Sequence, residues 1–390
     1  MESLKERESG IKIAHCADIH IGMKPNKLSR LSDTRRAEIK VSFFSMLDII
    51  KEKKVELFLI AGDLFHDLNV NNSEVNDVKN ALGELNCQVA ISPGNHDPFI
   101  VESPYNSIWP ENVYIFKKNF ISFFEMPEFK VRIWGSAFTP LNNSGARILS
   151  EDREKLKHDD FINILMVHGT YPAGGTGDDL YNPIYNEDIR ESGMNYIALG
   201  HIHKGTSVQR SGKTFYAYPG CLDGRSFKET GEKGFYLGTV SKTVCRLDFI
   251  KVSKRIYCEI NIDISESENS SEIVKRITEK IERLYGESYK DNIYKIILFG
   301  KIKENFFVDT SYIKRRLEDT VFYAEIFDET EIIYETKGVG IKAIFIKNMN
   351  EYIENCEDEE SKKIAQKALK LGVISFSKEV VFNEDKESGN

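Results

Sequence analysis

The sequence predicts an α/β protein of 390 residues that carries a smaller α+β domain towards its C-terminus. Three observations lead to this prediction. Short apolar segments alternate with amphipathic helical patterns through the first part of the chain, as they do in βαβ units. Most of these apolar segments end in glycine or in polar residues that can carry chemistry. Beyond residue 245 such residues cease and a β-α-β-α-β pattern follows, in a chain too long for one ordinary domain.

The stretch LFLIAGDLFHD, from Leu57 to Asp67, is the clearest of these strand ends. Its apolar residues predict a buried strand, and Gly62 allows the tight turn that lets Asp63 project from the strand's carboxyl end. Functional sites form at that end of the strands in open α/β sheets. Taken alone, Asp63 fits equally well as the N-cap of a helix. Four other junctions of the same kind favour a site.

These four junctions each place polar side chains directly after an apolar strand. Side chains alternate along a strand, so polar residues two positions apart are expected on one face. Strand ends that meet at the same edge of a sheet then bring their side chains together. The polar side chains at the ends of strands 11–17, 88–92, 161–167 and 196–199 are Asp18, His20, Asn95, His168, His201 and His203.

Helices are predicted between the first strands. Residues 34–54 carry an apolar stripe with lysine and glutamate on the other face, and residues 73–85 repeat this pattern with Ser73 as the N-cap. Both helices would serve as crossovers between parallel strands. Residues 112–138 contain short segments rich in Val, Ile, Phe and Trp, which suggest a second, more antiparallel sheet.

Composition restricts the class of protein. Hydrophobic residues make up 41% of the chain, enough for real cores, but no apolar run is long enough to cross a bilayer. The first ten residues are charged and include no apolar leader, so we expect a cytoplasmic protein. Six dispersed cysteines without a C-x-x-C pair are expected to be reduced. The net charge of -8 argues against a broad basic face, although bound metals would still attract phosphate.

The seven strand-end residues form an oxygen and nitrogen donor set without a thiolate. Such a set suits Mn, Fe or Zn, and it differs from a calcium site or a structural cysteine site. Seven ligands are too many for one ion, but they suit two ions that share a carboxylate. Two ions can activate a bridging water and stabilise the charge that develops during displacement at phosphorus. The sequence therefore predicts a two-metal hydrolase of phosphate esters.

The ordered motifs Asp18-x-His20, Gly62-Asp63, Gly94-Asn95-His96-Asp97, His168 and Gly200-His201-x-His203 resemble those of the calcineurin-like metallophosphoesterase superfamily. Within it, GDLFH at 62–66 and YPGCLDGRSFKETGEKGFYL at 218–237 look like the DNA double-strand-break repair nucleases, whose bacterial form is the SbcD subunit of the SbcCD exonuclease. The resemblance implies a four-layer αββα sandwich for residues 1–245.

The resemblance also implies roles for individual residues. Asp63 would bridge two divalent ions, most often Mn²⁺, with Fe or Zn as alternatives. His96 matches the family's catalytic histidine, and His66 matches a second histidine on the substrate side. Asp97 would orient His96, with simple stabilisation of its own loop as the alternative. One ion would be held by Asp18, His20, Asp63 and His203, and the other by Asp63, Asn95, His168 and His201.

Beyond residue 245 the resemblance is looser. Residues 246–335 match in position a capping domain that shapes access of DNA, and residues 336–390 comprise a charged helical stretch at 348–371 and an acidic tail. In the resembling nucleases a C-terminal segment docks on a coiled-coil ATPase of the SbcC type. The resemblance implies a DNA exonuclease and endonuclease subunit in DNA repair, which has that ATPase as its partner and forms a homodimer.

Two other functions stay compatible with these residues. A phosphatase or cyclic-nucleotide phosphodiesterase of the same superfamily would share the ligands, although His66 and the extra C-terminal domain disfavour it. A scaffold that had lost its metals would be expected to lack at least one ligand, and none is missing. Tyr105 and Trp109 could stack on bases, but packing is the better expectation. His15 should face away from Asp18, as a core or second-shell histidine.

Overall fold

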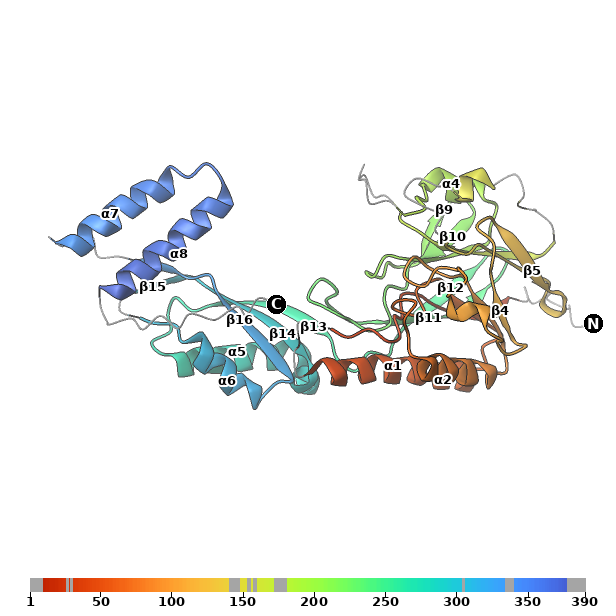
Figure 1. The fold of residues 1–390 in the computed structure, drawn as a ribbon, viewed down its shortest axis with the longest axis horizontal. Coiled ribbons are helices and arrows are strands. Elements are labelled where there is room, and N and C mark those ends of the chain that lie inside the picture. Colours follow the sequence, from red (N-terminus) through yellow and green to blue (C-terminus); the bar gives the residue numbers. More distant parts are fainter. Residues whose placement is uncertain are drawn as a thin grey trace, which may run out of the picture. The chain divides into compact units, whose positions relative to one another are not determined.

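The structure is a computed structural model that describes residues 10–25, 28, 31–139, 148–152, 156, 160–171, 181–303, 306–333 and 340–376 (Figure 1). It divides into two compact units, Met1–Tyr257 and Cys258–Asn390. The functional division into 1–245, 246–335 and 336–390 stays a prediction. Within the described ranges no helix is both long and apolar enough to span a bilayer.

The first unit contains two six-stranded sheets. The first sheet has the strand order β12-β11-β1-β2-β3-β4, in which β1 to β4 are parallel and β11 and β12 run antiparallel. Helices α1 (Ser32–Glu52) and α2 (Asn72–Gly83) connect its parallel strands. Its strands are β1 (Ile11–Cys16), β2 (Leu57–Ile60), β3 (Gln88–Ile91), β4 (Val113–Ile115), β11 (Gly234–Val240) and β12 (Cys245–Lys251).

Both crossover helices form close to the predicted ranges, although the buried face of α1 also includes Arg35 and Glu38 and leaves Val41 56% exposed. One core cluster joins Phe43 and Met46 of α1 and Val78 of α2 to Phe58 and Ile60 of the sheet. Burial of these side chains stabilises each helix more than its local propensity does. The N-cap of α2 is one detail that differs from the prediction. The cap is Asn71, whose side chain accepts the N–H of Ser73 at 2.9 Å, because Ser73 itself already lies in the helix.

The second sheet has the order β5-β6-β7-β8-β10-β9. The expectation of a more antiparallel sheet is wrong for its centre, because β6, β7, β8 and β10 pair in parallel. Only the edge strands β5 and β9 pair antiparallel. Parallel neighbours need crossovers, and α3 (Ile148–Glu151) and α4 (Asn186–Glu191) lie in two of them. The strands are β5 (Ser122–Met126), β6 (Val131–Gly135), β7 (Ile162–His168), β8 (Tyr196–Gly200), β9 (Gln209–Ser211) and β10 (Thr214–Ala217).

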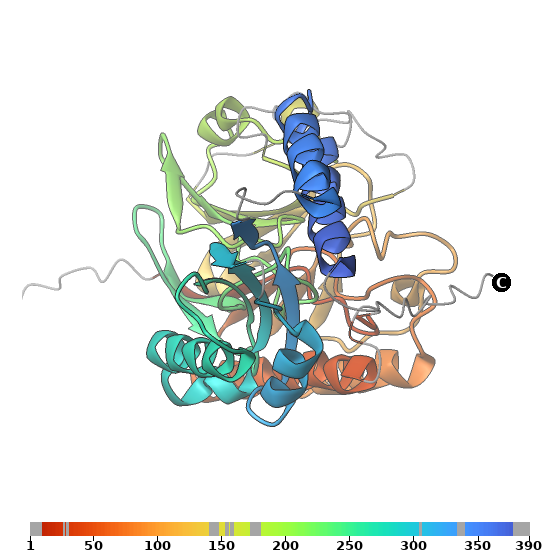
Figure 2. The same ribbon diagram turned by 90° about the vertical axis from the view of Figure 1, so that its left-hand side faces the viewer.

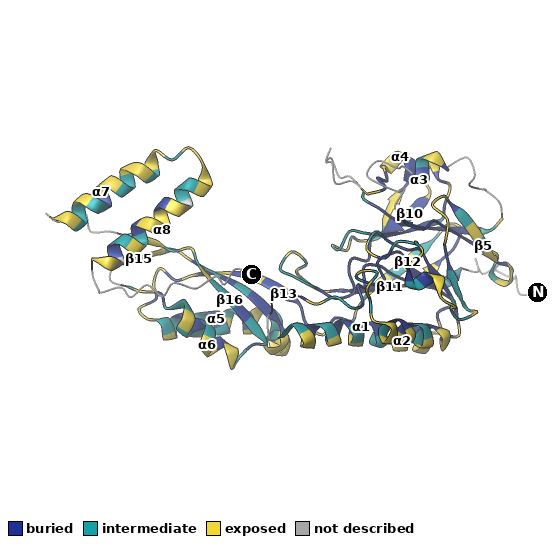
Figure 3. Cartoon of the chain, in the orientation of Figure 1, coloured by how far each residue is buried: buried dark blue, intermediate teal, exposed yellow. Residues whose placement is uncertain are grey.

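The two sheets pack face to face, which confirms the four-layer αββα architecture. A core cluster between them joins Ile13 and Leu59 of the first sheet to Ile133 and Ile164 of the second. A further cluster on the outer face of the second sheet includes Ile189 of α4. Figure 3 shows the resulting pattern, in which the strands are largely buried and the outer sides of α1 and α2 are exposed.

The second unit contains the predicted β-α-β-α-β order. Strands β13 (Tyr257–Asp263), β14 (Ile293–Phe299) and β16 (Tyr323–Asp328) form a sheet in the order β13-β14-β16. Helices α5 (Ser270–Tyr285) and α6 (Thr310–Glu318) lie next to each other in this unit (Figure 2). Strands β15 (Lys301–Lys303) and β17 (Glu331–Ile333) form a separate parallel pair.

The C-terminal helical stretch is two helices rather than one. Helix α7 (Ile341–Glu354) ends at Asn355, and α8 (Glu359–Ser375) begins after Asp358, whose side chain accepts the N–H of Ser361 at 2.7 Å. Gly372 does not end the second helix. A methyl group there would lie 2.3 Å from the ring of Phe345, so this glycine allows α7 and α8 to pack closely.

Candidate metal centre

Five strands deliver the seven predicted ligands to one place. Strands β1, β2 and β3 belong to the first sheet, and β7 and β8 belong to the second. One ligand is the last residue of β7, and the others lie in turns that follow their strands. The structure describes and brings together all seven: Asp18, His20, Asp63, Asn95, His168, His201 and His203.

Turn geometry, and not strand pleating, aims several of these side chains. Asp18, His20 and Asp63 have φ angles of 52°, 53° and 53°, in the left-handed region that non-glycine residues rarely adopt. Each such residue costs about 1–3 kcal/mol and persists only where its surroundings enforce it. Here the N–H groups of Ile19 and His20 both donate to the carbonyl oxygen of Asp63, at 2.9 and 3.0 Å. The period-of-two argument therefore found the correct pair for a different reason.

Two glycines allow the sheets to approach each other at this edge. A methyl group at Gly62, where φ is +95°, would lie 2.0 Å from Nδ1 of His168. A methyl group at Gly200 would lie 1.8 Å from the carbonyl oxygen of Ala61. Neither backbone could move that close with a larger residue. The glycines at the ends of β2 and β8 are therefore required for ligands from both sheets to meet.

The first group of ligands comprises Asp18, His20, Asp63 and His203, whose donor atoms all lie within 4.8 Å of one another. Nε2 of His20 lies 3.6 Å from Oδ2 of Asp63 and 3.4 Å from Nε2 of His203. Nε2 of His203 lies 3.5 Å from Oδ1 of Asp18. These spacings leave room for one ion between the four side chains, since ligand atoms around a single metal are about 3–4 Å apart.

A second group adjoins the first through Asp63. Nε2 of His168 lies 3.5 Å from Oδ2 of Asp63 and 3.0 Å from Oδ1 of Asn95, and Nδ1 of His201 lies 3.0 Å from the same amide oxygen. Oδ2 of Asp63 is buried and has no hydrogen-bond partner. A buried carboxylate oxygen in this state needs a cation. The residues therefore fit two divalent ions that share Asp63.

Three of the four ligand histidines have a partner at Nδ1 that leaves the other ring nitrogen available to an ion, whereas in His201 Nδ1 itself faces Asn95. Nδ1 of His168 donates to the carbonyl oxygen of Ala61 at 2.9 Å, and Nδ1 of His203 lies 2.7 Å from Oε1 of Glu229. Nδ1 of His20 lies 3.4 Å from Nδ1 of His66. In all three, Nε2 is left to face the ligand cluster, which is the arrangement found in metal-binding histidines.

The charges in the metal-free chain reflect these contacts. Although burial opposes ionisation, the imidazoles of His168 and His20 hold the pKa of Asp63 well below its usual range. Burial also opposes protonation of His168, but Asp63 raises its pKa to about 9. Asp18 and Glu229 raise the pKa of His203 to about 9 against the same effect. Burial and the charge on His168 lower the pKa of His201 to about 4.

The two histidines predicted on the substrate side lie next to the first ligand group. Rings of His66 and His96 stack at 5.5 Å, and both approach His20. Nδ1 of His96 donates to the carbonyl oxygen of His66 at 3.1 Å, and its backbone N–H donates to Oδ1 of Asp63 at 3.0 Å. His96 is exposed and His66 is partly exposed, so both can reach a substrate.

The predicted contact between Asp97 and the His96 ring is not formed. Asp97 is buried, and it accepts the N–H groups of Phe65 and Gly94 at 2.9 and 2.8 Å and the hydroxyl of Tyr105 at 2.6 Å. These donors occupy its oxygens, whereas the His96 ring binds a backbone carbonyl instead. Burial and the charge on Asp63 raise the pKa of Asp97 to about 6. Asp97 therefore joins the two site loops and does not bind the imidazole directly.

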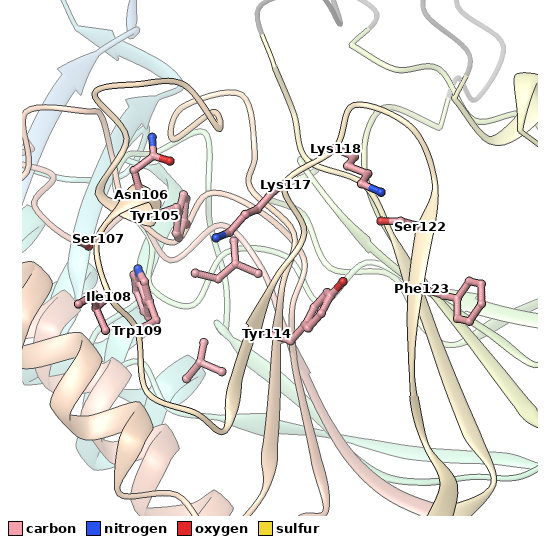
Figure 4. Close-up of a pocket in the computed structure, with 12 residues that line it drawn as sticks. Tyr105, Asn106, Ser107, Ile108, Trp109, Tyr114, Lys117, Lys118, Ser122 and Phe123 are labelled. Carbon is pink, nitrogen blue, oxygen red and sulfur yellow. The ribbon is translucent and has the colours of Figure 1, made fainter.

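A pocket of about 700 Å³ contains the two aromatic residues for which base stacking had been considered (Figure 4). The Tyr105 ring is fully buried and its hydroxyl is bound to Asp97, so packing is confirmed for this residue. Trp109 packs 5.7 Å from it, below the ammonium group of Lys79. The pocket lining includes none of the seven ligands: it consists of Tyr105, Asn106, Ser107, Ile108, Trp109, Val113, Tyr114, Ile115, Lys117, Lys118, Ser122 and Phe123.

Sequence reasoning found one other histidine correctly and missed two residues of the site. His15 is buried, with Nδ1 2.8 Å from the hydroxyl of Tyr196, as expected of a core histidine. Glu229 and Arg225 contact His203 but had been given no role. A ligand histidine implies some carboxylate or carbonyl partner, but no local pattern shows which acidic residue of the chain supplies it.

Comparison with known proteins agrees with this geometry. Residues 11–205 match the calcineurin-like phosphoesterase family. The chain is 32% identical over 284 residues to an uncharacterized metallophosphoesterase, YhaO, of Bacillus subtilis (strain 168), covering 69% of this chain and 67% of that protein.

Two archaeal proteins named DNA double-strand break repair protein Mre11 are also similar. The one from Aeropyrum pernix is 26% identical over 283 residues, covering 68% of this chain and 66% of that protein. The one from Methanocaldococcus jannaschii is 26% identical over 362 residues, covering 86% of this chain and 89% of that protein. The matches to YhaO and to the Aeropyrum protein thus span about two thirds of the length of those relatives. From its fold, its ligand cluster and these matches, the chain belongs to the calcineurin-like phosphoesterase family of metal-dependent hydrolases.

Proposed function

We propose that the chain is a two-metal, manganese-dependent DNA exonuclease and endonuclease subunit that hydrolyses phosphodiester bonds in DNA repair. The observation that carries the two-metal part is the buried, unpartnered Oδ2 of Asp63, which lies between Nε2 of His20 at 3.6 Å and Nε2 of His168 at 3.5 Å. A carboxylate oxygen approached from two sides by ligand nitrogens is suited to bridge two ions.

The ligands divide into two sets around this oxygen. In this proposal each set has two imidazoles, one oxygen donor that belongs to that set alone, and the shared Asp63 carboxylate. The mixed oxygen and nitrogen donors accept Mn, Fe or Zn, and manganese follows from the resemblance to the repair nucleases. The first set is Asp18, His20, Asp63 and His203, and the second is Asp63, Asn95, His168 and His201.

The protein's own residues would bind and protonate the substrate. When bound, the two ions would supply Lewis acidity and an activated water for attack on phosphorus. Nδ1 of His96 is committed to the carbonyl oxygen of His66, so Nε2 is the atom that meets a phosphate oxygen and, when protonated, gives its proton to the leaving oxygen. Since Nε2 of His20 faces the ions, its Nδ1–H donates to Nδ1 of His66. His66 then carries its own proton on Nε2, as a donor to phosphate.

DNA as the substrate rests on sequence similarity. A relative named DNA double-strand break repair protein matches 86% of the chain and therefore includes part of the C-terminal unit, which a minimal phosphatase would not need. The GDLFH motif places His66 beside His96, where two histidine donors can hold one phosphodiester. A phosphatase or cyclic-nucleotide phosphodiesterase of the same family is the alternative, and it would differ in how much polymer the site admits.

The proposal includes an SbcC-type ATPase partner and a homodimer. Helices α7 and α8 support the first, because large apolar side chains stay exposed on both of them. Ile344 of α7 is 60% exposed and Ile364 of α8 is 62% exposed. Clusters of exposed apolar side chains are characteristic of protein interaction surfaces. The SbcC-type subunit would therefore dock on this helical hairpin.

The first experiment measures Mn²⁺-dependent release of nucleotides from linear double-stranded DNA beside hydrolysis of bis-p-nitrophenyl phosphate. Both reactions should occur in the wild type, and both should be lost in Asp63→Ala, which removes the shared ligand. Glu74→Gln is a matched control, since this acidic residue pairs with Arg36 away from the ligand cluster.

Each result separates part of the proposal. Hydrolysis of the small ester with DNA intact, even after addition of an ATPase partner, would exclude the nuclease function and favour the alternative phosphodiesterase. Retention of activity in Asp63→Ala would exclude the two-metal assignment itself. Metal analysis of the active wild-type protein, purified without added manganese, identifies the ion.

A further inference from the structure

Glu229 makes a short polar contact with a predicted ligand, His203. Its Oε1 lies 2.7 Å from Nδ1 of His203, and its side chain is only 10% exposed. The guanidinium of Arg225 donates to the same oxygen at 2.7 Å, and the Arg225 backbone N–H donates to Oε2 at 2.8 Å. Both oxygens of this carboxylate are therefore held by Arg225.

These contacts determine the tautomer of His203. An ionised carboxylate can only accept, so Nδ1 of His203 must donate its proton to Glu229. The guanidinium of Arg225 lies close to both ring nitrogens and offers no acceptor. When His203 binds an ion as a neutral imidazole, its remaining proton stays on Nδ1 and Nε2 carries the lone pair. Nε2 is the atom that faces Oδ1 of Asp18 at 3.5 Å and Nε2 of His20 at 3.4 Å.

The corresponding histidine of the second ligand set is held differently. Nδ1 of His168 donates to the carbonyl oxygen of Ala61, an uncharged backbone acceptor, at 2.9 Å. An ionised carboxylate makes a histidine a stronger and better-oriented ligand than a neutral partner does. These two histidines therefore differ in their partner: His203 depends on a side chain that can be replaced, whereas His168 depends on the backbone.

The segment that carries Glu229 is anchored in the core. Asp223, two residues before Arg225, is fully buried and accepts the guanidinium of Arg35 at 2.5 Å and the hydroxyl of Ser42 at 2.8 Å. Both partners belong to helix α1. Because α1 packs on the same sheet that supplies Asp18, the carboxylate and the ion site share one rigid support. This is how positioning groups are held in efficient sites.

We propose that Glu229, clamped by Arg225, is the positioning residue for His203 and selectively sets the metal affinity of the site formed by Asp18, His20, Asp63 and His203. This inference rests on the two-metal assignment proposed above. It concerns affinity and ligand orientation, and it gives Glu229 no contact with the substrate. Loss of such a partner lowers metal affinity about 10- to 100-fold in metalloproteins.

The test is calorimetric titration of Mn²⁺ into the metal-free full chain, with Glu229→Gln placed in two backgrounds. Asn95→Ala weakens metal binding by the second ligand set, so the titration reports the affinity of the first set. Asp18→Asn weakens binding by the first set, so the titration reports the affinity of the second. We expect Glu229→Gln to lower affinity about 10- to 100-fold in the Asn95→Ala background and to leave it unchanged in the Asp18→Asn background. Glu229→Asp, which keeps the charge, should recover part of the loss.

Two controls separate this role from general destabilisation. Glu232→Gln changes an exposed acidic residue three positions along, which pairs with Lys251, and should leave both affinities unchanged. Arg225→Gln removes the guanidinium that holds Glu229 but keeps the carboxylate. It should lower the Mn²⁺ affinity of the set with His203 to a smaller extent than Glu229→Gln does. Thermal melting of each metal-free variant establishes that it is folded.

The results distinguish the inference from the function on which it rests. An equal effect of Glu229→Gln in the two backgrounds, or no effect in either, would overturn the inference while wild-type binding of two ions upheld the assignment. A wild-type chain that binds fewer than two Mn²⁺ ions would overturn the assignment, and with it the selective role of Glu229.

Discussion

Gly94 lies against the Asp63 carboxylate so closely that a methyl group at residue 94 would come within 2.1 Å of Oδ1 and 2.6 Å of the Asp63 backbone nitrogen. The N–H of Gly94 in turn donates to Asp97 at 2.8 Å. The loop after β3 is thus pressed onto the turn after β2. This contact brings Asn95 next to the shared carboxylate.

Gly94→Ala should therefore displace Asp63 and disturb both ligand sets. We expect a loss of at least one bound ion, together with a destabilisation of about 1–3 kcal/mol from overpacking. Metal content of the purified variant and its thermal midpoint measure the two effects. Gly231→Ala is the control, because φ there is +80° but no atom lies within 4 Å of the added methyl. It should cost about 1–2 kcal/mol and retain both ions.

His96→Gln should keep two bound ions and lose turnover. The imidazole lies outside both ligand sets, and its Nδ1 is bound to the carbonyl oxygen of His66. Loss of an acid of this kind typically slows a reaction about 10²- to 10⁴-fold. Metal content and hydrolysis of bis-p-nitrophenyl phosphate should be measured on one preparation. Loss of ions from this variant would make His96 a ligand and remove the proposed role.

The metal-free chain should lose stability as pH rises from neutral towards pH 9. Burial opposes charge on His168 and His203, but Asp63, Asp18 and Glu229 raise their pKa values from 6.5 to about 9. A pKa that is higher in the folded chain contributes stability that is complete below pH 6.5 and is lost as pH passes 9. Thermal midpoints of the metal-free chain across this range test the sign.

The same protons compete with metal ions. Binding at neutral pH must remove them from His168 and His203, so affinity for Mn²⁺ should increase with pH up to about pH 9. Calorimetry in buffers of different ionisation enthalpy measures the protons released. Binding with no proton release at pH 7 would contradict the raised pKa values.

Arg35→Met should strongly destabilise the first unit. The Arg35 guanidinium and the Asp223 carboxylate are both fully buried and pair at 2.5 Å, so removal of the cation leaves a buried charge. Such losses cost about 3–5 kcal/mol. Arg36→Met, at the next position, breaks a partly exposed pair with Glu74 and should cost about 1 kcal/mol or less.

Tryptophan fluorescence is a suitable measurement for this pair of variants. The chain has two tryptophans, Trp109 and Trp134, and both belong to the first unit. Denaturant unfolding followed by their emission therefore reports the unit that contains Arg35. Equal losses of stability in the Arg35 and Arg36 variants would show that the buried ion pair contributes no more than the partly exposed one.

Local patterns in the sequence were sufficient to find the ligands. Apolar runs ended by glycine located β2 and β8, and the residues just beyond them, Asp63 and His201, lie in the cluster. The stripe on α2 was readable because burial on one face leaves a period of 3.6. On α1 it was only partly readable, because Arg35 and Glu38 are buried there and Val41 is exposed. The parallel pairing of β6 with β7 was not readable, since strand propensity carries no information about direction.

The amino-acid sequence by itself determined the α/β class, the strand-end positions of the seven ligands and their oxygen and nitrogen chemistry. Only the tertiary structure decided how these residues act together. It placed Oδ2 of Asp63 between two ligand sets. It also bound Asp97 to backbone N–H groups and made Glu229 the hydrogen-bond partner of His203. The physical reason is range: periodicity and turn propensity act over a few residues, whereas these contacts depend on how two sheets pack across a shared core.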